Sequence, residues 1–160
     1  DISVAATSKA SIGMLQDKLS QLNSRMGTSV VINGYPSQDP SDDFAYRKAL
    51  KDLSHPACSI ISVPDHLYAS ITSDVIEAGV HPLVVKPLTP TLREAVLLND
   101  MAKAHKVHAA VEFHKRWDET NLLLRQAIKD NKLGDIRYIT VEYSQKRLMQ
   151  HIFTGYYKHF

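Results

Sequence analysis

Short apolar runs alternate with segments of helical periodicity along most of this chain, and this alternation constrains its fold more than any other feature. The apolar runs read as strands at residues 2–6, 29–32, 58–63, 83–85 and 107–113. The segments between them predict a first helix that follows Ser8 and ends at Gly27, and further helices over residues 44–53, 65–79, 89–106 and 120–131. Strands separated by helices form right-handed βαβ units, so the sequence predicts an α/β fold with a parallel sheet.

Local signals mark where these elements begin and end. In the first helix Ile12, Leu15, Leu19, Leu22 and Met26 recur at helical spacing and predict a core face. The dipeptide Asn33-Gly34 predicts a turn after the second strand. Asp65 is a plausible N-cap for the helix at 65–79. The helix that ends near residue 106 starts at either Thr89 or Thr91, and Thr91 has the spacing of a capping box with Glu94.

The pattern changes after Trp117, where we expect a domain boundary. Residues 136–143 alternate between apolar and polar positions, which is typical of a half-exposed strand in an antiparallel sheet. The sequence therefore predicts one domain over residues 1–117 and the start of a second over 118–160. The segment 148–160 is rich in aromatic residues and histidine and fits no predicted element.

Charge and composition exclude several classes of function. The net charge is +2, which gives no electrostatic basis for binding nucleic acid or an anionic membrane. Cys58 is the single cysteine, so no internal disulfide can form, and its apolar surroundings predict a buried, inert thiol. The sequence shows no membrane-span-length run and no signal peptide, and we expect a soluble cytoplasmic protein.

Lys86 is the residue whose position most suggests chemistry. It follows the apolar run Leu83-Val84-Val85 and precedes Pro87, so it stands at the carboxyl end of a predicted buried strand. Ligands of open α/β sheets bind outside the carboxyl ends of the strands, and a buried strand rarely ends in lysine for stability. The alternative is that the ammonium simply reaches solvent at the rim of the sheet.

Several motifs occur in the order and spacing of one known family. They are Ile61-Ser62-Val63-Pro64-Asp65-His66-Leu67-Tyr68, Glu77-Ala78-Gly79-Val80-His81, Val85-Lys86-Pro87-Leu88, Glu112-Phe113-His114-Lys115-Arg116-Trp117 and Gly134-Asp135-Ile136. Together they resemble the glucose–fructose oxidoreductase / inositol dehydrogenase (Gfo/Idh/MocA) family over residues 1–145. The resemblance implies a dinucleotide-binding Rossmann domain, followed by an α/β domain with a mostly antiparallel sheet through which the protein forms a homo-oligomer.

The resemblance also implies an activity and a set of site residues. Family members oxidise a sugar or cyclitol hydroxyl, or reduce the matching carbonyl, with NAD or NADP. Carried onto this sequence, Lys86 is the catalytic residue that hydrogen-bonds the reacting oxygen. The residues carried over to the cofactor are Pro64, Asp65, His66, Lys86 and Pro87, and those carried over to the substrate are Tyr68, His114 and Arg116.

Other interpretations of these residues stay open. His66 could be only a polar residue in the first turn of a helix, Tyr68 a core residue, and Arg116 one partner of a surface ion pair. Trp117 is predicted to pack rather than to recognise a ligand.

Three residues depart from the family pattern, and two of them, Val85 and Tyr68, support a second function class. Val85 replaces a glutamate that contacts the cofactor, Tyr68 replaces a histidine, and His114 replaces an asparagine. A non-catalytic relative that binds dinucleotide or sugar and regulates a partner protein, like the yeast galactose-pathway repressor of this family, is therefore the alternative to an enzyme.

The glycines indicate that the pyrophosphate-binding turn of a Rossmann domain is missing. No G-x-G-x-x-G motif occurs, and the first predicted strand resembles the second strand of the family, so the sequence reads as the middle of a longer protein. In that alignment Thr7, Ser8 and Lys9 stand where an acidic residue would select NAD. A hydroxyl followed by a lysine suits a 2′-phosphate and predicts NADP, although Ser8 could be only a helix cap.

Overall fold

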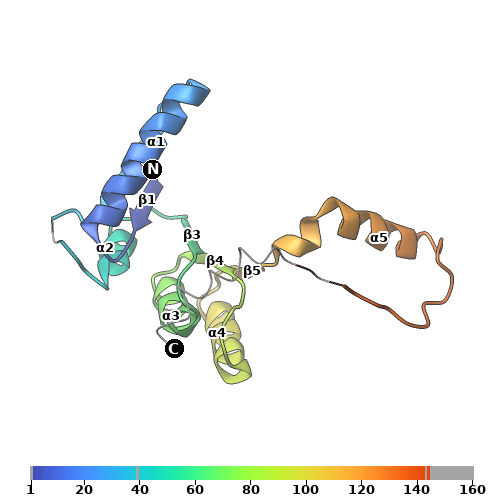
Figure 1. The fold of residues 1–160 in the computed structure, drawn as a ribbon. Helices are drawn as coiled ribbons and strands as arrows, with labels where there is room; N and C mark the ends of the chain where they lie inside the picture. The colour runs from blue at the N-terminus through green and yellow to red at the C-terminus, as the bar shows by residue number, and fades with distance from the viewer. Residues whose placement is uncertain (1, 39, 143, 145–160) are drawn as a thin grey trace. The chain divides into compact units, whose positions relative to one another are not determined.

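The chain folds into two compact units, Asp1–His114 and Lys115–Phe160, in a computed structural model that describes residues 2–38, 40–142 and 144. The division falls three residues before the boundary expected from the sequence. Figure 1 shows the two units along the chain, the first in blue to yellow and the second in orange.

A two-stranded parallel sheet forms the first part of the larger unit. Strand β1 (Ile2–Ala5) pairs with β2 (Ile32–Tyr35), in a register that runs from Ile2 opposite Ile32 to Ala5 opposite Tyr35. Helix α1 (Lys9–Met26) connects the two strands, and α2 (Ala45–Lys51) follows β2. Helix α1 buries Ile12, whereas Leu15, Leu22 and Met26 are exposed. The prediction that all of these residues form a core face was therefore wrong beyond the first turns of the helix.

Strand β2 lies three residues later than the sequence indicates. The run predicted as a strand at 29–32 is mostly irregular, and Asn33 and Gly34 continue the strand instead of forming a turn. The reason is packing: a Cβ atom built on Gly34 would meet Cγ2 of Ile12 far inside van der Waals contact. Gly34 is therefore the position at which α1 comes closest to the sheet.

A three-stranded parallel sheet forms the second part of this unit. Its order is β3 (Cys58–Ile61), β4 (His81–Val85) and β5 (Ala110–Glu112). Helices α3 (Tyr68–Glu77) and α4 (Leu92–Ala104) connect these strands. Ile61, Tyr68, Val75, Val80 and Val84 form the main buried cluster, between the sheet and α3. The predicted parallel α/β fold is confirmed.

The starts of α3 and α4 resolve the capping alternatives. Asp65 does not cap a helix; it opens the short 3₁₀ helix η1 (Asp65–Leu67), which leads into α3. Thr91 is the N-cap of α4, since its hydroxyl oxygen accepts the backbone N–H of Glu94 at 3.3 Å and donates to the Glu94 carboxylate at 2.7 Å. The reciprocal bonds satisfy a backbone donor that the helix itself leaves open.

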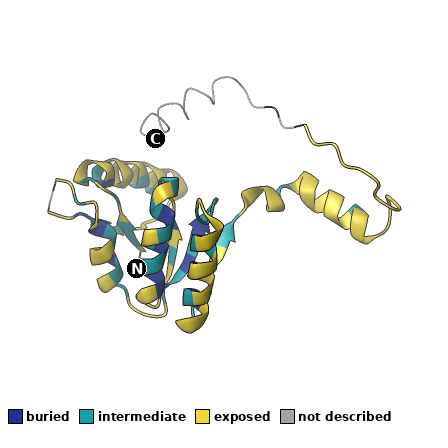
Figure 2. Ribbon diagram, turned by 90° about the horizontal axis from the view of Figure 1, so that it is seen from below, coloured by how far each residue is buried: buried dark blue, intermediate teal, exposed yellow. Residues whose placement is uncertain are grey.

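The second unit contributes one long helix to the described part of the chain. The short 3₁₀ helix η2 (His114–Trp117) leads into α5 (Glu119–Lys129), which is exposed along most of its length (Figure 2). Residues 136–142 form no strand, so that prediction was wrong. A half-exposed strand needs a neighbour to complete its hydrogen bonds, and no described segment pairs with this one. The segment 148–160 lies outside the described residues.

A search of the described helices found none that is both long and apolar enough to cross a lipid bilayer.

Candidate functional site

The carboxyl ends of β3, β4 and β5 lie along one edge of the sheet. Because the strands are parallel, with Ile61 opposite Val84 and Val85 opposite Glu112, the residues that follow them emerge on the same side. Three of the sequence motifs therefore meet there: Pro64-Asp65-His66 after β3, Lys86-Pro87 after β4, and His114 after β5. We call this the carboxyl edge of the sheet.

Lys86 lies where β4 leaves the core. Val84 is fully buried, Val85 is half-buried and Lys86 is exposed. Within the described part of the chain, the Lys86 ammonium makes no hydrogen bond and no ion pair. A strand that is buried up to its last residues thus presents an unpaired cation at the edge where ligands of such sheets bind.

Tyr68, the first residue of α3, is buried in the core. Only 3% of the residue is exposed, and it belongs to the same buried cluster as Val75 and Val84. Burial raises the pKa of its hydroxyl above the ordinary value. This placement agrees with the core alternative, and contact of Tyr68 with a substrate stays a prediction.

His114, just after β5, lies next to the carboxylate of Glu112. Its Nδ1 atom lies 3.5 Å from Oε2 of Glu112, and both side chains are partly exposed. When protonated, the imidazole is therefore partly neutralised by Glu112, and an exposed pair of this kind is weak.

The start of α1 holds the residues proposed to select the cofactor. Oγ of Ser8 accepts the backbone N–H of Ser11 at 3.2 Å, so Ser8 does cap the helix. Lys9 is the first residue of α1, whose first turn contains no acidic residue. Lys9 also lines a hollow of about 600 Å³ with Tyr35 and Ser37 of the neighbouring chain segment.

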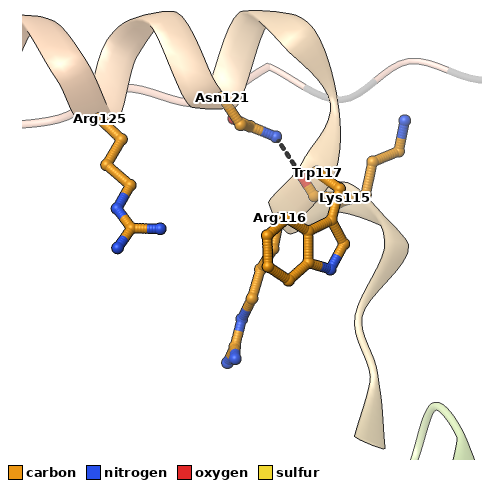
Figure 3. Close-up of a pocket in the computed structure, with 5 residues that line it drawn as sticks. All are labelled: Lys115, Arg116, Trp117, Asn121 and Arg125. Carbon is orange, nitrogen blue, oxygen red and sulfur yellow. Dashed lines mark hydrogen bonds between the residues drawn. The ribbon is translucent and has the colours of Figure 1, made fainter.

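A basic hollow in the second unit was missed by sequence reasoning. Lys115, Arg116, Trp117, Asn121 and Arg125 line a hollow of about 520 Å³ (Figure 3). Trp117 is 69% exposed, so the packing role expected for it is not seen among the described residues. The side-chain amide of Asn121 donates a hydrogen bond to the backbone carbonyl of Lys115. The ammonium of Lys115 lies 2.8 Å from a carboxylate oxygen of Asp118. The sequence signal that could have predicted this hollow is the run of basic and aromatic residues at 115–117. Nothing in the sequence pattern indicates that Asn121 and Arg125 belong to it.

A parallel α/β unit with polar residues at the carboxyl ends of its strands is typical of α/β proteins that bind a ligand at that edge, dinucleotide-binding proteins among them. Within that class, residues 11–113 match the family model of the Gfo/Idh/MocA oxidoreductases, described as an oxidoreductase family with an NAD-binding Rossmann fold. This match covers more than half of the chain, and the protein belongs to that family.

Two curated relatives illustrate the similarity. An uncharacterised oxidoreductase of Schizosaccharomyces pombe is 34% identical over 77 residues, which cover 48% of this chain and 21% of that protein. The scyllo-inositol 2-dehydrogenase (NADP(+)) of Bacillus subtilis is 32% identical over 88 residues, 55% of this chain and 25% of that protein. The matched segments thus span only a fifth to a quarter of these relatives' length.

Two solved structures share the fold. A levoglucosan dehydrogenase in complex with NADH and levoglucosan gives a TM-score of 0.59 at 23% identity, covering 84% of this chain and 31% of that one. The myo-inositol 2-dehydrogenase of Lactobacillus plantarum gives 0.60 at 15% identity, covering 84% and 34%. At these identities the similarity establishes the Rossmann-type fold alone.

Proposed function

We propose that the intact protein transfers hydride between NAD(P) and a hydroxyl or carbonyl group of a sugar, cyclitol or similar small molecule. The observation that carries this proposal is the exposed Lys86 ammonium at the carboxyl end of β4, which has no partner among the described residues, in a chain of an NAD-binding oxidoreductase family. The names of the relatives, an inositol and a levoglucosan dehydrogenase, support this substrate class.

The carboxyl edge fits a nicotinamide cofactor by the chemistry of its groups. Pro64 and Asp65 are half-buried at the start of η1, and Lys86 supplies a cation with open hydrogen-bonding capacity. These residues, with His66 and Pro87, would hold the nicotinamide end, and the bound nicotinamide supplies the hydride chemistry.

Lys86 would act on the proton that accompanies hydride transfer. Its Nζ atom would donate a hydrogen bond to the reacting oxygen, and it would take or return that oxygen's proton as the alcohol and carbonyl interconvert. His114 and Arg116 are proposed to contact the other hydroxyls of the substrate, since both carry hydrogen-bond donors.

The activity test compares Lys86→Ala with Lys103→Ala in the full-length protein. Lys103 is an exposed lysine of α4 that lies outside the proposed site. We expect Lys86→Ala to lower kcat about 100-fold, the usual contribution of a positioned acid–base group, and to weaken dinucleotide binding far less, since Lys86 is one of several residues proposed to hold the nicotinamide end. Lys103→Ala should match the wild type. Equal kcat values for the two variants, on a substrate that the wild type accepts, would refute the role of Lys86.

We also propose that NADP is preferred over NAD. Lys9 and Ser8 stand at the N-terminus of an 18-residue helix whose first turn lacks acidic residues, which favours a bound phosphate. The related Bacillus subtilis dehydrogenase is named for NADP(+). Ser8 already serves as the cap, so Lys9 would supply most of the selectivity.

Titration of Lys9→Ala and Lys18→Ala with both dinucleotides tests this preference. We expect Lys9→Ala to weaken NADP binding about tenfold, the value of one charge-assisted hydrogen bond, with little change for NAD. Lys18 is exposed on the same helix and serves as the matched control. If Lys9→Ala weakened both cofactors equally, the preference would not arise at this helix.

A regulatory relative without catalysis is the second candidate. It is favoured by Val85, an apolar residue beside Lys86, and by the burial of Tyr68 in the core. Dinucleotide or sugar binding without turnover across a panel of polyols and their ketones would select this candidate over the enzyme.

A further inference from the structure

The amino ends of β4 and β5 are joined by a side chain as well as by backbone hydrogen bonds. The paired region of these two strands begins with Leu83 opposite Ala110. Two residues before that pair on each strand, the backbone N–H of His108 donates a hydrogen bond to Nδ1 of His81 at 3.0 Å. Pro82 lies between His81 and the paired region and has no N–H to donate. The imidazole of His81 therefore extends the link between the two strands beyond the point where their pairing begins.

His81 also holds β3, on the other side of β4. Its backbone N–H donates to the carbonyl of Ala57 at 3.0 Å, and it lies opposite Cys58 in the pairing of β3 with β4. One residue thus ties the amino end of β4 to both neighbouring strands. The bond toward β3 joins backbone groups that do not titrate, whereas the bond toward β5 depends on the ionisation of a side chain.

The connection from α4 to β5 relies on this side chain for its last step. The N–H groups of His105, Lys106 and Val107 all donate to carbonyls of α4. The N–H of His108 is the next one along the chain, and its acceptor is the His81 ring rather than the helix. The bond between His108 and His81 is therefore the point at which this connection leaves the helix and becomes attached to the sheet.

Only the neutral form of His81 can make this bond. A ring nitrogen that accepts an N–H bears no proton, so the neutral ring carries its proton on Nε2. In the imidazolium both ring nitrogens are donors, so protonation replaces the hydrogen bond by two N–H groups that face each other. Histidine changes its charge between about pH 5 and 8, and this bond lies at an exposed position that solvent protons can reach.

Other titratable groups lie on the segments around His81. They are Cys58 in β3, His55 before β3, Glu77 in α3, and His105, Lys106 and His108 between α4 and β5. The ring centroid of His108 lies 5.6 Å from that of His81, so its protonation also changes the charge beside the bond. Among the residues that the structure describes, no three His, Cys, Asp or Glu side chains are placed to hold a metal ion together, so a proton is the ligand to which this histidine pair is suited.

We propose that the bond between His81 and His108 is a pH-sensitive latch on β5, closed at neutral pH and released as the pH falls. Strand β5 is only three residues long, so loss of the bond before its first residue frees its amino end together with the connection from α4. The same strand leads to His114 at the carboxyl edge of the sheet. Acidification therefore loosens, from the opposite end, a strand that supports the candidate site.

Amide hydrogen exchange of the wild-type protein, resolved by residue with NMR, measures the latch. The protection factor of the His108 N–H, corrected for the intrinsic pH dependence of exchange, is compared between about pH 7.5 and about pH 5. We expect it to fall about tenfold at the lower pH, the equivalent of one hydrogen bond. The N–H of His81, which is bonded to Ala57, is the internal reference and should keep its protection.

Two substitutions of His81 separate the acceptor from the charge. His81→Asn places a carbonyl oxygen that does not titrate near the position of Nδ1, so His108 should stay protected at both pH values. His81→Leu removes the acceptor, so the protection of His108 should be about tenfold lower at both pH values.

Two further variants control for the neighbouring histidines. His105→Asn changes an exposed histidine at the end of α4 and should keep the wild-type pH response. His108→Asn keeps the backbone N–H that is bonded to His81 but removes the second ring, so it should keep that response as well.

The imidazole spectrum of the wild type gives a measurement that needs no variant. Long-range proton–nitrogen correlation should show His81 as the Nε2–H tautomer near neutral pH. The Nδ1–H tautomer there, unchanged protection of His108 between the two pH values, or an equal fall in protection in His81→Asn would each overturn the proposal. None of these measurements involves turnover or cofactor binding, so the latch is tested separately from the proposed function.

Discussion

At the scale of single residues, two glycines show how differently the same residue type is used. Gly34 in β2 has no room for a Cβ atom, because Ile12 of α1 occupies that space with a branched, inflexible side chain. Gly13, next to Ile12 in the helix, faces open space. The first glycine is required by packing, and the second only lowers the helix propensity.

Gly34→Ala and Gly13→Ala are therefore predicted to change stability in opposite directions. Gly34→Ala should lower the free energy of unfolding by about 1–3 kcal/mol, the usual cost of overpacking. Gly13→Ala should raise it by about 1 kcal/mol through helix propensity. Urea denaturation followed by circular dichroism measures both values. A neutral Gly34→Ala variant would mean that α1 does not sit on β2 as described.

At the scale of elements, the contact between α2 and α3 joins the two sheets of the larger unit. Asp74 holds both Tyr46 and Arg47 through one carboxylate oxygen. Burial, followed by the hydrogen bond to Asp74, raises the pKa of the Tyr46 hydroxyl above 10.0. A raised pKa means that the neutral hydroxyl stabilises the fold below about pH 10, and that this stabilisation is lost as the pH rises through the folded-state pKa.

Tyr46→Phe is predicted to change the alkaline stability profile. The wild type should lose stability above about pH 10, where the unfolded tyrosine begins to ionise. The variant should be about 1 kcal/mol less stable at pH 8 because the hydrogen bond is gone, and its decline above pH 10 should be shallower. Urea titrations between pH 8 and 12 compare the two chains. Tyr138→Phe, at a residue 85% exposed, is the control and should follow the wild type.

At the scale of the whole molecule, the chain combines a Rossmann-type parallel sheet with a sequence that lacks the glycine-rich turn of that fold. The carboxyl edge places Lys86, His66 and His114 at the ends of parallel strands, but the sequence has no G-x-G-x-x-G turn for the pyrophosphate. In Rossmann domains that turn and the helix after it bind the pyrophosphate, so we expect the edge residues alone to bind a dinucleotide weakly.

The 160-residue chain by itself is predicted to bind NADP in the millimolar range at best and to show no turnover. Isothermal titration with NADP and NAD measures the affinity, and absorbance at 340 nm follows any reduction of the cofactor. A chain that binds either dinucleotide stoichiometrically at micromolar concentration would contradict both this prediction and the assignment of β1 to the second strand of the family.

Local patterns in the sequence were enough to predict the parallel α/β architecture, the capping box of Thr91 and the position of Lys86 at the end of β4. Each of these depends on residues close in sequence: side-chain periodicity selects helix or strand, and a cap is made by a residue three positions away. The motifs also identified the family, since several of them occur together in its order and spacing, and residues 11–113 match its model.

Only the tertiary structure decided the register of β2, the burial of Tyr68 and the contact of Asp74 with α2. These features depend on residues brought together from distant parts of the chain, such as Ile12 above Gly34, for which sequence periodicity carries no signal. The same reason explains why the strand predicted at 136–143 does not form over residues 136–142. Alternation shows which face of a strand can be buried, but a strand forms only where a partner completes its hydrogen bonds.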